Sequence, residues 1–332
     1  MSANSTQPGA SDATGWWMKA SSLFTGSRGT LIGLILLCLV LSLTTDTFLT
    51  VRNILNVLDQ VTVLGIMAIG MTLVILIGGI DLSVGSILAL AGMVFGYTVH
   101  PDYLGMPVIL GVVTALLAAG ACGLVSGLLT TVARLPSFIA TLAMMSVARG
   151  LANIITDGSQ IVGFPSWFSD LSIVRHFGFL SVTVALMLVL AVLFAIFLNF
   201  RAAGRNLYAI GGSPEVARLS GIPVAWLTTL VYVVCAMLAG LAGIVLAARL
   251  DSVQPSSGLG YELDTIAAVV IGGASLFGGV GSIGGTAIGV LIIGVLRNGL
   301  NLLGVSPFIQ QVIIGAVIAL AVAADTWRRD SK

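Results

Sequence analysis

The sequence predicts an all-α protein, a polytopic bundle of about ten membrane-spanning helices. Hydrophobic residues make up 58% of the chain and charged residues only 8%, whereas soluble domains carry about 25% charged residues. The apolar residues occur in long runs, and about 20 such residues cross the hydrocarbon of a bilayer as a helix. The formal net charge of +1 provides no electrostatic basis for binding nucleic acid.

Apolar runs that suit membrane spans follow one another from residue 31 to residue 325. The predicted spans are 31–50, 58–78, 82–99, 107–133, 137–156, 181–200, 224–248, 262–278, 283–303 and 308–325. We interpret residues 31–325 as one transmembrane domain, with a mobile cytoplasmic tail of residues 1–30 before it and a cytoplasmic tail of residues 326–332 after it. Residues 1–30 are polar and lack the basic-then-apolar pattern of a cleaved signal peptide.

The Lys and Arg residues between the spans predict that both termini lie in the cytoplasm, because cytoplasmic loops carry an excess of these residues. With this orientation the inner side holds Lys19, Arg28, Arg134, Arg201, Arg205, Arg218, Arg328, Arg329 and Lys332. The outer side holds only Arg52, Arg175 and Arg249, together with most acidic residues, including Glu262 and Asp264.

The longest predicted outer loop is 157–180. Its aromatic residues suit a membrane interface; they are Phe164, Trp167, Phe168 and Phe177.

The predicted inner segment 201–223 differs from the other inner connections, which are only a few residues long. Its signals predict one short helix: Ser213 can cap it, Pro214 suits its first position, and Glu215 favours its first turn. Gly221 ends the helix, and Tyr208, Val216 and Leu219 offer an apolar face. So short a helix is not stable alone in water, so we expect a docking partner.

Glycines recur every four residues at the start of the span 283–303, as Gly281, Gly285 and Gly289. This spacing lets helix backbones approach closely, so we assign these glycines to helix packing. The run 279–284 also matches the G-x-G-x-x-G dinucleotide pattern, but no acidic residue lies between Asp264 and Asp325 to complete that fingerprint.

The chain lacks the residues of an enzyme. Its only lysines, Lys19 and Lys332, are not in a phosphate-binding Gly-Lys-Ser/Thr context. The cysteines Cys38, Cys122 and Cys235 lie in apolar runs and suit packing, and the two histidines are isolated, so we predict no metal site. We therefore expect no catalysis and no cofactor in this chain; a partner ATPase would use ATP and Mg²⁺.

A few polar residues within or beside the spans are candidates for a translocation pathway or gate, because such groups usually face the protein interior. They are Asn56, Gln60, Asp81, Ser83 and Asn298. The alternatives stay open: Asp81 suits a cap that accepts amides near Val84, and the amide side chains suit bridges between helices. Arg149 and Arg297, also in or near spans, need partners or water.

Three motifs identify a resemblance that runs from about residue 30 to residue 325. They are GGIDLSVGS at 78–86, GRNLYAIGG at 204–212 followed by ARLSGI at 217–222, and the glycine-rich stretch from Ile271 to Gly285. The chain resembles the inner-membrane permease subunits of ribose/galactose/arabinose-type ATP-binding-cassette importers. The segment around Glu215–Ser220 departs from the better-known Glu-Ala-Ala…Gly loop of other importers.

This resemblance implies a permease dimer of identical or related copies in a bacterial inner membrane, with ATPase subunits in the cytoplasm and a periplasmic sugar-binding protein. It implies that residues 215–220 form the helix that couples the permease to the ATPase. The coupling residues would be Gly204, Arg205, Ser213, Pro214, Glu215, Ala217, Arg218 and Gly221.

The predicted function is translocation of a monosaccharide, driven by the partner ATPase and supplied by the binding protein, which would dock on residues 157–180 and 249–261. An ion-coupled secondary transporter of a small polar solute is the alternative, and a passive channel or structural membrane protein ranks third. Affinity would reside in the binding protein, which agrees with our finding no aromatic-plus-carboxylate sugar site in the sequence.

Overall fold

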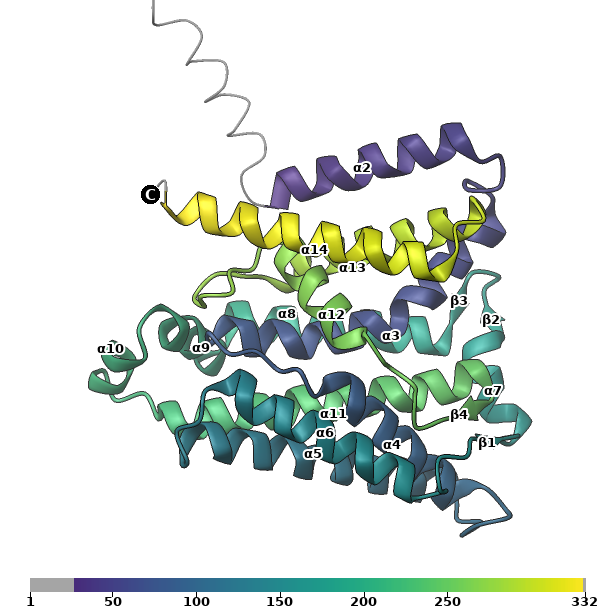
Figure 1. Cartoon of the computed structure of the whole chain (residues 1–332), viewed down its shortest axis with the longest axis horizontal. Coiled ribbons are helices and arrows are strands. Elements are labelled where there is room, and N and C mark those ends of the chain that lie inside the picture. Colours follow the sequence, from purple (N-terminus) through teal and green to yellow (C-terminus); the bar gives the residue numbers. More distant parts are fainter. Residues whose placement is uncertain (1–26, 331–332) are drawn as a thin grey trace, which may run out of the picture.

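The computed structural model describes residues 27–330, which form a predominantly helical bundle (Figure 1). The predicted tail of residues 1–30 therefore lies almost entirely outside the described residues, as do residues 331–332. The long helices run between two ends of the molecule. They are α2 (Ser27–Thr44), α3 (Val51–Leu76), α4 (Val84–Val99), α5 (Val108–Thr131), α6 (Ser137–Ile154), α8 (Val182–Phe200), α11 (Val224–Leu250), α13 (Ile283–Leu302) and α14 (Pro307–Asp330).

Short elements cover the two ends of the bundle. At one end, which we call the α10 end, lie α9 (Ala202–Gly212) and the protruding α10 (Pro214–Leu219) (Figure 1). At the other, the strand end, lie α7 (Ser166–Ile173) and two antiparallel pairs. These are β1 (Ile161–Val162) with β4 (Ser252–Val253), and β2 (Arg175–His176) with β3 (Leu180–Ser181). One further short helix, α12 (Tyr261–Ile271), lies within the bundle.

Among the described residues, six helices are long and apolar enough to cross a membrane: α3, α5, α6, α8, α11 and α13. Three more predicted spans coincide with shorter apolar helices, Gly29–Thr44, Val84–Val99 and Pro307–Leu320. The predicted span 262–278 is wrong, because α12 has 11 residues and ends at Ile271. Its length of about 16 Å is roughly half of the hydrocarbon thickness.

Helices α3 and α11 form the centre of the bundle. In the most apolar 18-residue stretch of each helix, 83% of the residues of α3 and 72% of those of α11 are buried. The corresponding share for α8 is only 17%. Small residues allow close packing here: a Cβ on Gly70 would lie 2.9 Å from the Cα of Cys235, and one on Gly243 would overlap the Leu88 carbonyl. Cys122 and Cys235 are free and buried, in agreement with the predicted packing role.

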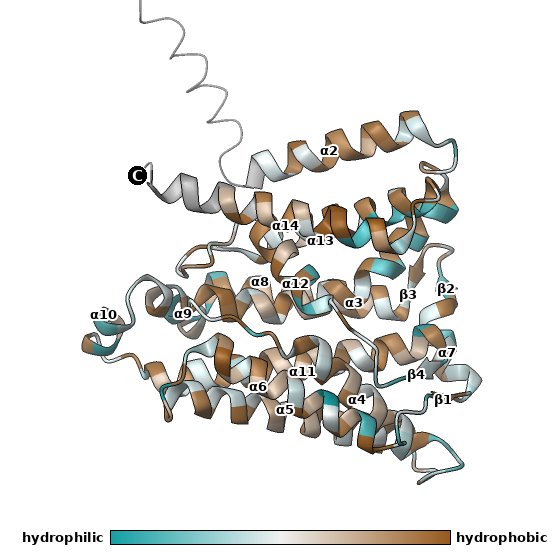
Figure 2. Cartoon of the chain, in the orientation of Figure 1, coloured by the Kyte–Doolittle hydropathy of each residue, from teal (hydrophilic) through white to brown (hydrophobic). Residues whose placement is uncertain are grey.

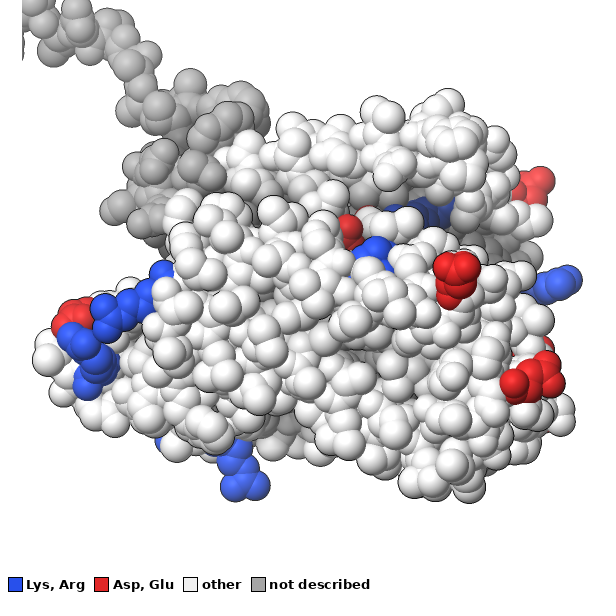
Figure 3. Space-filling model, turned by 60° about the horizontal axis from the view of Figure 1, so that its bottom comes forward, with Lys and Arg blue, Asp and Glu red and all other residues white. Residues whose placement is uncertain are grey.

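The outer helices present apolar side chains to the surroundings. Much of α2 is coloured hydrophobic in Figure 2, and Leu39 and Leu43 of α2 and Leu193 of α8 are exposed. Lys and Arg cluster on the protruding α9–α10 region, and other charged side chains lie at the opposite end and near the middle of this face (Figure 3). An apolar outer surface with charged ends is what a bilayer requires.

The predicted aromatic interface of the 157–180 loop is only partly correct. Phe164 and Phe168 are buried and pack against Phe95 of α4, with ring centroids 5.5 Å and 4.8 Å away. Trp167 and Phe177 are exposed. The two buried rings therefore hold α7 on the bundle, since aromatic side chains contribute large apolar areas to a core.

A broken crossing replaces the predicted span 262–278. Val253 packs on Gly92 and Gly96 of α4, whereas Gly258 contacts Gly85, about three turns nearer the start of that helix. The chain therefore enters the bundle from the strand end through segment 251–260, which contains β4 and a run of turns, and continues as α12 toward the α10 end. As a result, the start of α2 and the end of α14 both lie toward the α10 end (Figure 1).

Arg149 of α6 holds segment 251–260 in place. Its guanidinium Nη1 donates hydrogen bonds to the carbonyl oxygens of Pro255 and Ser257, the second at 2.8 Å. Arg149 is thus paired with backbone, one of the two outcomes that the sequence left open for it. Charge-assisted bonds of this kind are among the stronger hydrogen bonds in proteins.

We expect Arg149→Met to lower the stability of the protein by about 2–4 kcal/mol, because two carbonyl groups lose a charged donor. Thermal unfolding in detergent measures this effect. Ser146→Ala is the matched control, since Ser146 lies on the same helix, is exposed, and bonds only to a carbonyl of its own helix. Equal midpoints for Arg149→Met and the wild type would show that the segment 251–260 does not depend on Arg149.

Candidate functional site

The α10 end carries the segment that the sequence singled out. The predicted caps are confirmed: the Ser213 hydroxyl accepts the Val216 amide at 3.3 Å, and Pro214 is the first residue of α10. Gly221 ends the helix with φ of +81°, and the Gly221 and Ile222 amides bond to the Arg218 and Ala217 carbonyls. A positive φ at the end of a helix favours glycine.

The prediction of one helix in segment 201–223 is wrong, because α9 precedes α10. Gly204 and Arg205 therefore lie on α9. A Cβ on Gly204 would overlap the backbone of α8, and Leu207 and Ile210 are buried. Tertiary contacts stabilise a helix whose glycines would disfavour it in isolation.

Gly211 fixes α9 against the centre of the bundle. A Cβ there would overlap the carbonyl oxygen of Leu76, the last residue of α3, and the amide nitrogen of Gly279. The Leu76 carbonyl in turn accepts the Gly279 amide at 2.9 Å. Helix α9, the end of α3 and the 272–282 loop thus meet backbone to backbone, so that a displacement of α9 is transmitted directly to α3.

Tyr208 adds a second tie between α9 and this loop. Its hydroxyl donates to the Gly281 carbonyl at 2.9 Å, and burial raises the pKa of Tyr208 above its ordinary value. The hydroxyl therefore remains a donor over the physiological pH range. Tyr208 consequently does not belong to an exposed face shared with Val216 and Leu219, as the sequence had suggested.

The outer surface of α10 is apolar and uncovered. Val216 is 61% exposed and Leu219 is 79% exposed, while Ala217 is buried beneath them. Glu215 and Arg218 form an exposed ion pair at 2.7 Å, which contributes little to stability in water. Two large apolar side chains on a protruding, charged end form a surface that a protein partner can bury.

We expect Gly221→Val to abolish the coupling of solute uptake to a partner bound at α10, while the protein still inserts into the membrane. A β-branched residue at φ of +81° costs about 1–2 kcal/mol and redirects the chain after α10. Gly221→Asn is the matched control, since asparagine tolerates this conformation. Solute uptake per molecule of inserted protein is the measurement. Equal uptake by the two variants would show that the turn after α10 has no role in coupling.

A second candidate region is a row of amide side chains along one face of α3. Asn53, Asn56 and Gln60 lie three to four residues apart, which places them along one side of the helix. At the strand end this face lines a cavity of about 680 Å³. The lining residues are Thr47, Thr50, Arg52, Asn53, Asn56, Arg175 and Leu302.

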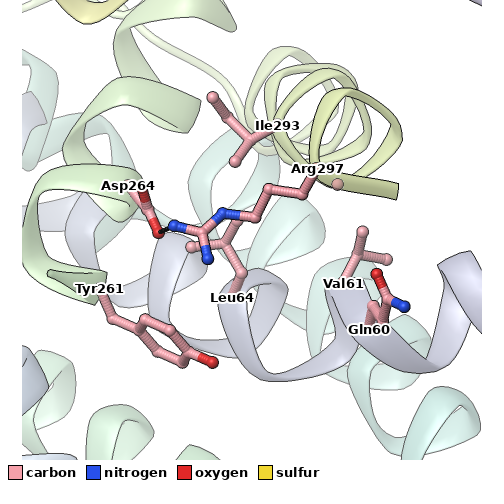
Figure 4. A pocket seen from close by; sticks show the side chains of 8 residues that line it. Gln60, Val61, Leu64, Tyr261, Asp264, Ile293 and Arg297 are labelled. Atoms are coloured by element: carbon pink, nitrogen blue, oxygen red, sulfur yellow. Dashed lines mark hydrogen bonds and ion pairs between the residues drawn. The ribbon is translucent and has the colours of Figure 1, made fainter. Parts of the chain in front are cut away.

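Deeper along α3, a separate pocket of about 50 Å³ lies between α3, α12 and α13 (Figure 4). It shares no lining residue with the outer cavity. Gln60 borders it from α3, Tyr261 and Asp264 from α12, and Arg297 from α13. The Arg297 guanidinium reaches across to the Asp264 carboxylate and forms an ion pair with it (Figure 4). Ligand pockets usually have volumes of about 300–1,000 Å³, so the pocket as it stands does not hold a monosaccharide.

Toward the α10 end of this pocket the helices pack tightly. A Cβ on Gly289 would overlap the Ala268 carbonyl, and one on Gly285 would overlap the Gly272 carbonyl. Gly281 differs from these, because it precedes α13 and contacts Ala274 and Leu76. The Thr72 and Thr286 hydroxyls join α3 to α13 at 2.7 Å. The structure therefore has a wide cavity at the strand end, a separate narrow pocket, and tight helix packing toward the α10 end.

The remaining predicted pathway residues, Asn298, Asp81 and Ser83, do not line either cavity. Asn298 is buried and exchanges two hydrogen bonds of 2.9 Å with Asn53, so it bridges α13 and α3, the alternative that the sequence left open. Asp81 is fully buried and accepts the Ser83 amide and hydroxyl at 2.8 and 2.5 Å. It therefore bonds to Ser83 just before α4, rather than to amides from Val84 onward.

Comparisons with known proteins decide the family. The family described as "Branched-chain amino acid transport system / permease component" matches residues 53–322. The chain belongs to this family. It is 45% identical over 321 residues to the ribose import permease protein RbsC of Escherichia coli (strain K12), covering 95% of each chain.

Two further relatives lie in the same range. RbsC of Bacillus subtilis (strain 168) is 46% identical over 300 residues, covering 90% of this chain and 92% of the relative. The D-allose transport system permease protein AlsC of Escherichia coli (strain K12) is 37% identical over 306 residues, covering 92% and 93%. No solved structure matches the chain.

In this family member, sequence reasoning missed the contribution of α12 to the narrow pocket. Asp264 was assigned to the outside of the membrane, whereas it is buried and paired with Arg297. Tyr261 and Asp264, three residues apart, share a face of α12. This spacing was the available signal, but the false span 262–278 placed Tyr261 outside and obscured it. An aromatic side chain and a carboxylate, the combination that was not found in the sequence, therefore line the same pocket.

Over the described range 27–330, no group of three or more His, Cys, Asp or Glu side chains is arranged to hold a metal ion. The charged groups of the pocket are one carboxylate and one guanidinium, and the guanidinium already neutralises the carboxylate. The pocket therefore offers side chains that can form hydrogen bonds with a neutral polar ligand.

Proposed function

We propose that this chain is the membrane-spanning permease subunit of an ATP-binding-cassette importer for a monosaccharide of the pentose or hexose type. The named relatives are import or transport permeases for ribose and allose. The observation that carries the proposal is the rigid α9–α10 unit, which ends in an uncovered apolar surface and is attached by backbone contacts to α3. Such a unit suits the transmission of movement from a partner to the bundle.

The partner at the α10 end would be a cytoplasmic ATPase, which would use ATP and Mg²⁺, whereas this chain would bind neither. The coupling surface would comprise Ser213, Pro214, Glu215, Ala217, Arg218 and Gly221 on and around α10, with Gly204 and Arg205 on α9. Arg134, Arg201, Arg205 and Arg218 lie at or near the α10 end, which supports its assignment to the cytoplasmic side of a bacterial inner membrane.

The partner at the strand end would be a periplasmic sugar-binding protein. Segments 157–180 and 249–261 would contribute to its docking surface, above the 680 Å³ cavity. The solute would pass from this cavity along Asn56 and Gln60. Amide side chains suit the hydroxyl groups of a neutral sugar, because they offer both donors and acceptors.

A second copy of the permease would complete the transporter. Between α12, α13 and α14 lies a groove of about 240 Å³ that includes Arg297, Gln310 and Gln311. Arg297 is 40% exposed there, although a charged group facing lipid at mid-membrane is costly. A second permease subunit covering this groove would shield these polar groups.

Reconstitution with candidate partners tests the proposal. We expect the permease to co-purify with an ATPase subunit in mild detergent, and the complex in liposomes to take up labelled ribose or a related sugar only with ATP and the loaded binding protein. Absence of a bound ATPase, together with no ATP-dependent uptake of any tested monosaccharide, would contradict the proposal. The secondary-transporter alternative is not favoured by the family to which the chain belongs.

A further inference from the structure

We propose that a cleft between α8 and α11, beside α9, binds one acyl chain of an anionic phospholipid whose phosphate lies against Arg201. This inference goes beyond the proposed function, because it requires that the chain spans a membrane and not that it transports a sugar. We call this site the lipid cleft. Its volume is about 190 Å³, and its lining side chains come from α3, α8, α9 and α11.

The side chains of the lipid cleft are apolar throughout. All of them belong to Leu, Val, Phe or Ala residues, among them Leu73 of α3, Phe197 of α8, Leu207 of α9 and Leu230 of α11. A buried water needs polar partners, and none of these side chains offers one. An empty cleft would leave them without packing partners on one side, which forfeits dispersion energy. An apolar chain is therefore the occupant that suits the cleft.

The lipid cleft is accessible from the membrane side of the bundle. Helices α8 and α11 are both long and apolar enough to cross a bilayer. Both pack on α3, whereas they have hardly any contacts with each other. Leu73 is buried at the floor, while Leu230 is exposed and Phe194, Phe197 and Leu227 are half-buried. An acyl chain of the surrounding bilayer can therefore enter between the two helices.

Arg201 provides the charge complementarity for an anionic headgroup. It joins α8 to α9, is exposed, and lies two residues before Ala203, which lines the cleft. Within the described part of the chain neither Arg201 nor Arg205, one turn later, forms an ion pair. Exposed Trp226 precedes the lining residue Leu227, and tryptophan is enriched at the level of lipid headgroups. A guanidinium there can bind a lipid phosphate through paired N–H groups.

A lipid in this cleft would be an additional packing partner of α9. Ala203 and Leu207 of α9 line the cleft, whereas a Cβ on Gly204 or Gly211 would overlap protein backbone on the other contacts of this helix. The acyl chain would thus complete the apolar surroundings of α9. The lipid composition of the bilayer would therefore affect how firmly α9 is held on the bundle.

Quenching of tryptophan fluorescence by brominated lipids tests the lipid cleft in the full-length permease, reconstituted without partner proteins. Two matched reporters are used: Leu230→Trp at the cleft and Leu193→Trp on the exposed surface of α8. Leu230 lies six residues after the start of α11 and Leu193 seven before the end of α8, so each is about 10 Å from the α10 end of its helix. The native tryptophans are replaced by phenylalanine; they are Trp16, Trp17, Trp167, Trp226 and Trp327.

The liposomes contain equal amounts of phosphatidylglycerol and phosphatidylcholine, and the acyl chains of only one of the two lipids are brominated in each preparation. Leu230→Trp should be quenched more strongly by brominated phosphatidylglycerol than by brominated phosphatidylcholine. Leu193→Trp should be quenched equally by both. Arg201→Gln should lower the preference at position 230 by about 5-fold, the usual contribution of one basic side chain at an anionic membrane surface.

Two pairs of variants separate the headgroup contact from the chain contact. Arg134→Gln makes the same change at another exposed arginine near the α10 end and should leave the preference intact. Ala203→Phe fills the cleft and should remove the preference, whereas Ala202→Phe, at the exposed neighbouring residue, should retain it. If either Arg201→Gln or Ala203→Phe fails to insert, the other decides.

Equal quenching of Leu230→Trp by the two lipids would overturn the lipid cleft. So would an equal loss of preference in Arg201→Gln and Arg134→Gln, which would reflect general surface charge. Absence of quenching by either lipid would show that protein covers the cleft, and this too would contradict the proposal. None of these readouts involves transport, so their outcome is independent of whether the proposed function holds.

Discussion

We expect Gly211→Ala to abolish ATP-driven uptake and Gly212→Ala, at the adjacent glycine of α9, to leave it intact. A Cβ at position 211 would overlap the Leu76 carbonyl and the Gly279 amide, both of which are backbone groups that cannot rotate away. A Cβ at position 212 meets nothing within 4 Å. Both residues are helical, and alanine favours a helix over glycine, so propensity acts in the same direction at both positions.

The physical reason for the effect is the junction of α3, α9 and the 272–282 loop. Forcing α9 away from Leu76 would break the 2.9 Å bond between the Gly279 amide and that carbonyl, or leave α9 undocked. Overpacking of a tight contact costs about 1–3 kcal/mol. Uptake in membrane vesicles, normalised to inserted protein, and thermal unfolding in detergent measure the two consequences. Equal uptake by both variants would show that α9 does not transmit movement through Gly211.

Val216→Asp combined with Leu219→Asp should release the ATPase and thereby eliminate uptake, while the permease remains folded. Both side chains are exposed on α10, so the change removes no internal packing. An interface that buries two large apolar side chains gains about 1.5–3 kcal/mol from each, and carboxylates buried there would add a desolvation cost. Co-purification of the ATPase with the permease is the measurement.

Phe177→Asp provides the matched control for this surface. Phe177 is 90% exposed on the loop between β2 and β3 at the strand end, so an equally drastic polar change there should leave the ATPase bound. Retention of the ATPase by the Val216→Asp/Leu219→Asp variant would contradict the role of α10 as the docking helix.

The caps of α10 could be predicted because they depend on residues close together in the sequence. The capping of α10 depends on Ser213, Pro214 and Gly221, whose effects act over a single turn and are visible in the sequence. Helix α9 was missed for the opposite reason. Three of its residues are glycines, which lower intrinsic helix propensity, and contacts with α3 and α8 compensate for them only in the folded chain.

The false span 262–278 has a related cause. Its composition is apolar enough for a membrane helix, but Gly272 and Gly273 end α12, the latter with φ of +96°. Hydropathy counts residues and does not reveal that the crossing begins at 251 with β4 and a run of turns in place of a helix. The same limitation concealed the pocket, because the pairing of Asp264 with Arg297 depends on where α12 starts.

The polar stripe on α3 was partly visible in advance, since Asn56 and Gln60 stood out as amides near the start of a span. Their separate roles were not visible. Asn56 lines the outer cavity, Gln60 lines the narrow pocket, and Asn53 is bonded to Asn298. Which member of a polar stripe faces a cavity depends on the neighbouring helices, and that information lies outside any single span.

The central claim is that the work of transport reaches this chain from a separate ATPase through α10. The most direct test compares uptake by the purified permease in liposomes with and without the ATPase, using ATP in one series and an imposed ion gradient in the other. The account predicts accumulation against a gradient only with the ATPase, ATP and the loaded binding protein together. Accumulation by the permease alone, driven by the ion gradient, would contradict it.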